Sequence, residues 1–95
     1  MPGYVIADVD VLDLAGFEEY RARVAGTIAA YGGRYLVRGG ETETAEGDWS
    51  PQRLIVLEFP SLARAREWFA SPEYAPLIAL RQRTARTKLV FAEGL

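Results

Sequence analysis

The residues best suited to acid–base chemistry are two carboxylates within apolar, strand-like segments. Glu58 interrupts the apolar run at 54–59, and Asp8 lies in an alternating segment near the N-terminus. A carboxylate in an apolar setting must be hydrogen-bonded, paired or protonated, and acids with shifted pKa values gather at active sites. Glu58 is therefore the best candidate for a general base and Asp8 the second. The alternative for each is a structural acid satisfied by Arg or Tyr.

Arg38 is the first candidate for binding a ligand. It directly precedes Gly39 and Gly40, where we expect a β-bulge or bend. Such a bend would turn the planar guanidinium toward a pocket, where it suits an anionic ligand. The alternative is that Arg38 forms an ion pair with a neighbouring carboxylate such as Glu58.

Two further pairs of residues are candidates for the same pocket. Glu46 and Arg53 flank a turn at nearly mirror positions, which predicts either a surface ion pair or a rim arginine that binds a carboxylate or phosphate. Tyr74 and Arg81 fall on a short helix near the segment SPEY, and they serve either the pocket or the docking of that helix. Trp49, in the turn, is either an anchor for a partner or a lid over the pocket.

Composition excludes several kinds of chemistry. The chain of 95 residues has 13 acidic and 11 basic residues and neither Cys nor His. Thiol nucleophiles, thiolate metal sites and histidine bases are therefore absent, and we expect no metal and no cofactor. The net charge of −2 gives no general attraction to nucleic acid or to anionic membranes. Without an apolar run long enough to span a membrane or a signal-peptide pattern, the expected location is the cytoplasm.

Hydrophobic periodicity predicts the elements that must position these residues. Alternation predicts strands at 4–11, 34–38, 53–59 and 88–93, with a polar continuation of the second strand at 41–46. An apolar stripe of helical period begins after Asp13 and ends at Gly32 and Gly33; further helices begin at 62 and 71. The order β-α-β-β-α-β predicts one domain over 1–95 with an α+β, ferredoxin-like fold, in which the helices cover one face of an antiparallel sheet.

The strands carry apolar side chains on both faces. In the third strand Ile55, Leu57 and Phe59 alternate with Leu54 and Val56, and the last strand repeats this pattern. A sheet with one face in water should instead alternate apolar and polar residues. An apolar patch of this size is normally buried, and the simplest partner is a second copy related by a two-fold axis. We therefore expect a homodimer whose sheets pack face to face.

Several motifs in fixed order resemble a known family. GGRYLVRGG, EGDWSPQRLIVLEFPS, SPEY and ALRQR are similar to the small bacterial proteins called domain of unknown function thirteen-thirty. The resemblance runs from the first strand to Glu93 and Gly94, and it implies a dimeric α+β barrel. That superfamily includes cofactor-independent monooxygenases, small isomerases, dechlorinating enzymes and haem-binding proteins. The family brings no established catalytic residues, and the absence of His here argues against haem.

Two functional hypotheses follow, and a third remains open. The first is a homodimer that binds a small organic molecule, anionic or neutral, in a pocket lined by Arg38, Glu58, Tyr74 and Arg81. The second is a cofactor-independent enzyme, similar to a monooxygenase or isomerase, that uses Glu58 or Asp8 as its base. The third is a purely structural or interaction protein.

Overall fold

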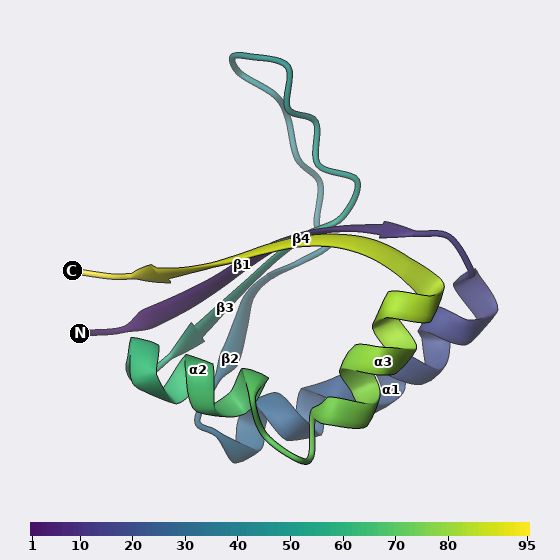
Figure 1. Ribbon diagram of the computed structural model, residues 1–95. Coiled ribbons are helices and arrows are strands. Elements are labelled where there is room, and N and C mark those ends of the chain that lie inside the picture. The colour runs from purple at the N-terminus through teal and green to yellow at the C-terminus, as the bar shows by residue number, and fades with distance from the viewer.

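The computed structural model describes residues 1–95 and has the predicted α+β order. Its elements are β1 (Gly3–Val11), α1 (Leu14–Ala30), β2 (Arg34–Arg38), β3 (Leu54–Phe59), α2 (Leu62–Phe69), α3 (Ala75–Thr84) and β4 (Ala85–Glu93). Figure 1 shows a curved sheet with all three helices on one side of it. None of these helices is both long and apolar enough to cross a membrane.

The helix boundaries follow from capping residues visible in the sequence. Asp13 accepts a hydrogen bond from the backbone N–H of Gly16 and caps the start of α1. α1 ends at Ala30, and Gly32 then leaves the helix with a φ of 79°, a conformation that is cheap only for glycine. Ser61 caps α2 through the N–H of Arg64. α3 begins at Ala75, later than the start predicted at Ser71-Pro72-Glu73, although the Ser71 hydroxyl does accept from the N–H of Tyr74 in the turn before the helix.

The four strands form an antiparallel sheet in the order β2-β3-β1-β4. Val5, Ala7 and Val9 of β1 face the helices and are buried. The intervening residues of β1 and their partners in β3 and β4 lie on the other side of the sheet. No helix covers that side, which we call the open face (Figure 1). The predicted alternation of apolar residues onto both faces of β3 and β4 is confirmed by the register of these strands against β1.

The largest buried side chains lie between the helices and the sheet. Trp68, Tyr74, Phe59, Leu77 and Val5 are each less than 2% exposed. The rings of Trp68 and Tyr74 are stacked with centroids 4.1 Å apart, and Phe59 lies 5.4 Å from Trp68. Aromatic residues of this size contribute much of the burial energy of a small domain.

The predicted strand at 41–46 is wrong. Residues 40–52 form no helix or strand; they project from the open face as an exposed loop, which we call the arm (Figure 1). β2 ends at Arg38, and Gly39 then turns the chain with a φ of 70°. Within the arm, Thr44 Oγ1 donates to the carbonyl of Trp49 at 2.8 Å. The Thr-rich alternation resembles a strand, but this segment has no neighbouring strand with which to form a ladder.

Candidate functional site

A narrow cavity of about 40 Å³ lies between the helices and the sheet. Most of its 18 lining residues are hydrophobic, and every helix and strand contributes to it. Its charged lining residues are all arginines: Arg21, Arg38, Arg53 and Arg81. No carboxylate lines the cavity, which is therefore cationic in a protein of net charge −2.

The inner wall of the cavity is aromatic. Tyr20 of α1 and Tyr74, which precedes α3, join their hydroxyl groups at 2.7 Å. Burial raises the pKa of Tyr20 well above its usual value, so its hydroxyl stays protonated. Trp68 stacks on Tyr74 and donates from Nε1 to Thr27 Oγ1 at 3.0 Å. These fixed partners hold the aromatic wall in one arrangement.

Arg81 is the most deeply buried charge in the cavity, with 6% of its surface exposed. Its Nε has no hydrogen-bond partner, and none of the three ion pairs in the structure involves it. Arg21 Nε and Thr87 Oγ1 are the other two buried side-chain atoms without a partner, and both residues also line the cavity. A buried cation without a counter-charge is strongly unfavourable, so the inner cavity is suited to receive an acceptor.

Three arginines surround the outer part of the cavity, which we call the rim. Arg38 lies 4.4 Å above the ring of Tyr35, as a cation–π pair. Burial, and then the charges of Arg21 and Arg38, lower the pKa of Arg53 from its usual value. Arg21 has a partly exposed partner in Glu18, with Nη1 and Oε1 2.9 Å apart. The rim therefore carries three positive charges, and Glu18 is the one acid that forms an ion pair with any of them.

A bulge in β2 directs Arg38 into the cavity. Tyr35 pairs with Leu57, but Val37 pairs with Val56, so Leu36 is an extra residue in β2. Strict alternation would put Arg38 on the face opposite Tyr35, whereas the bulge returns it to the same face. Arg38 was expected to turn inward through a bend at Gly39 and Gly40. The structure places the irregularity within the strand instead.

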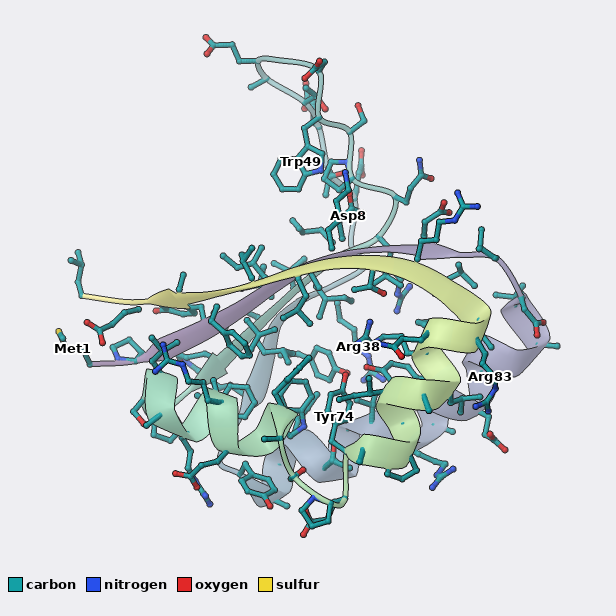
Figure 2. All side chains as sticks on the ribbon, viewed as in Figure 1. Met1, Asp8, Arg38, Trp49, Tyr74 and Arg83 are labelled. Atoms are coloured by element: carbon teal, nitrogen blue, oxygen red, sulfur yellow. The ribbon has the colours of Figure 1, made fainter.

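Gly39 makes room for the rim rather than for a bulge. A Cβ added there would come within 2.6 Å of Arg53 Nη1. Arg53 therefore packs directly over the backbone at the end of β2, beside Arg38. Figure 2 shows Arg38 between the sheet and the helices, on the same side as Tyr74.

Glu58 does not line the cavity. It lies on the open face, where Arg34 donates from Nε at 2.9 Å and from Nη2 at 2.7 Å, and Tyr4 donates at 3.2 Å. The hydrogen bond from Arg34 is the main reason that the pKa of Glu58 lies below its usual value. The proposed pairing of Glu58 with Arg38 is wrong, because the register of β2 places Arg34 opposite Glu58.

Asp8 also lies on the open face, beneath the arm (Figure 2). It accepts from Trp49 Nε1 at 3.0 Å and from the N–H of Gln52 at 2.9 Å. The bond from Trp49 is the leading cause of the lowered pKa of Asp8. Trp49 therefore fixes the arm to the sheet on the side away from the cavity, which argues against its predicted role as a lid.

Glu46 and Arg53 are not partners. Glu46 lies exposed in the arm, and Arg53 reaches the rim of the cavity. No ion pair joins them, because the arm does not continue the sheet and so brings no mirror position opposite Arg53. Of the predicted ligand-binding residues, the structure brings Arg38, Arg53, Tyr74 and Arg81 together and leaves Glu46 outside.

The sequence profile of the family described as "Domain of unknown function (DUF1330)" matches residues 2–95. The chain belongs to the DUF1330 family. No curated protein matches the sequence.

Solved structures agree on the fold. A protein of unknown function from Rhodopseudomonas palustris is 18% identical, with a TM-score of 0.78 over 99% of this chain and 82% of its own. A dimeric ferredoxin-like protein of unknown function from Jannaschia sp. is 14% identical, with a TM-score of 0.72 over 99% of this chain and 100% of its own. SnoaB, a cofactor-independent oxygenase from Streptomyces nogalater, is 15% identical, with a TM-score of 0.67 over 99% and 93% of the two chains.

Among the lining residues with polar groups, sequence reasoning about this DUF1330 protein missed four: Tyr20, Arg21, Tyr35 and Thr87. Arg21 lies on the apolar stripe of α1, four residues after Phe17 and three before Val24, so helical spacing alone could have placed it inward. Thr87 shares a face with Leu89, but the predicted strand began only at 88. β4 in fact begins at Ala85.

Proposed function

We propose that this DUF1330 protein binds a small organic anion in the cavity between its helices and its sheet. The observation that carries this proposal is the cluster of four arginines around a cavity that no carboxylate lines. Arg81, the buried one of the four, has no ion pair, and an unpaired buried charge costs more than its contacts return. An anionic ligand would supply the missing counter-charge.

The lining favours an organic ligand over an inorganic ion. Apart from its arginines and Thr87, the cavity is lined by apolar and aromatic side chains. Small-molecule sites combine an apolar lining with a few polar groups that fix orientation. Free phosphate or sulfate would leave most of this lining without a partner.

The proposal includes a homodimer formed through the open face. Apolar residues of all four strands lie there, including Ile6, Val56 and Val90, and Val90 is 57% exposed. The similar Jannaschia protein is described as dimeric. Burying apolar area contributes roughly 25 cal/mol per Å², so a few hundred Å² on each copy is enough to hold a partner. Light scattering should give twice the chain mass at micromolar concentration, and a monomer would contradict this part of the proposal.

A screen of small organic acids by thermal shift tests the ligand. We expect at least one acid to raise the melting temperature of the wild type, and Arg38→Ala to reduce that shift. Arg86→Ala is the matched control, because Arg86 is exposed on the open face and lies outside the cavity. If every acid that binds shifts the Arg38→Ala protein as much as the wild type, or if none binds, the proposal is wrong.

A cofactor-independent enzyme is the second candidate. Similarity in fold to SnoaB favours it, and the hydroxyl pair of Tyr20 and Tyr74 offers protonated groups inside the cavity. Glu58 and Asp8 are poorly placed as bases for that cavity, since both lie on the open face with lowered pKa values. Oxygen uptake or turnover of a bound acid without added cofactor would support an enzyme, and Tyr74→Phe should then reduce the rate.

A further inference from the structure

The cavity contains buried polar groups that can donate hydrogen bonds but have no partner in the protein. Arg81 Nε and Thr87 Oγ1 are both buried and both without a partner. They come from α3 and from β4, on opposite walls of the cavity. We call these two groups, together with the hydroxyl pair of Tyr20 and Tyr74, the inner site.

The chemistry of these groups limits what can bind there. A guanidinium donates through its nitrogens, accepts nothing and does not lose its proton in proteins. In the tyrosine pair, one hydroxyl donates to the other, which leaves the second hydroxyl with a hydrogen to donate. The hydroxyl of Thr87 also has a hydrogen to offer. The inner site therefore has a buried cation without a counter-charge beside hydroxyl groups that can donate, and an oxyanion would satisfy both.

The cavity is large enough for the head group of a ligand but too small for a whole aromatic molecule. A cavity of about 150 Å³ is known to hold benzene, whereas this one measures about 40 Å³. A head group fits inside, and a larger body must extend toward the rim. There, the guanidinium of Arg38 lies over the ring of Tyr35, 4.4 Å from its centroid, and because Arg38 is exposed its outer side is open to a flat ring, which stacks well on a guanidinium.

We infer that the inner site binds the carboxylate of a small aromatic acid, which enters head first and leaves its ring near Tyr35 and Arg38. Arg81 and Thr87 hold the carboxylate oxygens, and the rim arginines attract the anion to the opening. A planar carboxylate matches the planar fork of a guanidinium better than a tetrahedral anion does. This inference rests on the proposed function and adds the head group, its orientation and its deepest contacts.

Titration calorimetry at neutral pH tests the inference with benzoate, its neutral isostere benzamide, and inorganic phosphate. We expect benzoate to bind the wild type and benzamide to bind roughly tenfold or more weakly, because a charged hydrogen bond is lost. Phosphate should bind more weakly than benzoate, since phosphate has no apolar group to pack against the apolar lining. Phosphate binding as tight as that of benzoate would overturn the aromatic part of the inference.

Variants of the inner site separate this inference from the proposed function. Arg81→Gln should weaken benzoate roughly tenfold or more, and Thr87→Val, which keeps the shape of the side chain, by roughly threefold or more. Arg83→Gln is the control, because Arg83 is exposed on the same helix and points away from the cavity (Figure 2), and it should change affinity less than about twofold. Thr87→Val keeps the test valid if Arg81→Gln fails to fold.

Three outcomes are decisive. If Arg38→Ala weakens benzoate while Arg81→Gln and Thr87→Val do not, the anion stays at the rim; the inner site is then wrong and the proposed function stands. If another organic acid binds through Arg38 but benzoate does not, the aromatic class is wrong. If no organic acid binds the wild type, both the inference and the proposed function fail.

Discussion

On the helix-covered side of the sheet, Arg81 is buried without an anionic partner, whereas on the open side Glu58 has both Arg34 and Tyr4. Asp8, also on the open side, is satisfied by Trp49 and Gln52. The open face thus has satisfied carboxylates among apolar residues, and the cavity has a buried arginine, Arg81, without an ion pair. An interface between two copies needs its charges neutralised before assembly, whereas a binding site keeps its charge free for a ligand.

The largest difference between the two sides should appear on removal of an aromatic side chain from the helix side. Trp68→Ala removes the ring that packs against Tyr74 and Phe59 and leaves a void, so we expect the free energy of unfolding to fall by about 3–5 kcal/mol. Val90→Ala on the open face, studied in dilute monomer, should cost much less because Val90 is already exposed. Denaturant titration compares the two, and equal losses would remove the contrast in packing between the faces.

A charge placed on the open face should affect assembly more than folding. Val56 lies at the centre of that face, paired with Ile6 on one side and Val37 on the other. Val56→Asp should weaken the dimer roughly 100-fold or more, because association would bury an unpaired carboxylate. Sedimentation at several concentrations measures this change. Ala63→Asp, exposed on α2, is the control, and a variant dimer as tight as the wild type would show that the open face is not the interface.

The smallest effect concerns acid stability on the open face. The folded-state pKa of Glu58 lies below its unfolded value of about 4.3, so the group stabilises the fold above that pH. This contribution is lost as the pH falls through the folded-state value. Glu58→Gln should therefore lower the melting temperature near neutral pH, and the difference from wild type should close in acid.

Substitution of an exposed glutamate is the control for the pH dependence of the melting temperature. Glu19 on α1 forms no ion pair, so Glu19→Gln should leave the pH dependence of the melting temperature close to that of the wild type. A difference between Glu58→Gln and wild type that stays constant down to pH 2 would show that ionisation of Glu58 does not stabilise the fold.

The fold was predictable because its signals are local. Alternation located the strands, Asp13 and Ser61 marked helix starts, and Gly32 marked a helix end. The arm was not predictable, because a Thr-rich alternating segment has the pattern of a strand whether or not another strand lies beside it. A strand forms only where a partner supplies the ladder of hydrogen bonds.

The candidate site was predictable in part. Arg38, Tyr74 and Arg81 were predicted to line it and do so, but Glu58 was assigned to the same pocket and lies behind the sheet. Alternation along β3 already placed Glu58 on the open face. The error was to assign residues from both faces of the sheet to one pocket. The missed Arg21 needed only its place on the stripe of α1, whereas the bulge at Leu36 depends on how β2 pairs with β3, which no local pattern records.

Because of that bulge, the charge of the cavity depends on where the extra residue lies in β2 as well as on which amino acids the strand contains. If the extra residue lay after Arg38 instead of before it, the same amino acids would carry one positive charge across to the side of Glu58 and leave the opening with two arginines. An insertion or deletion within the five residues of β2 would therefore change the charge of the cavity, as a substitution of Arg38 would. Redesign of the proposed binding site can begin with the spacing of the backbone.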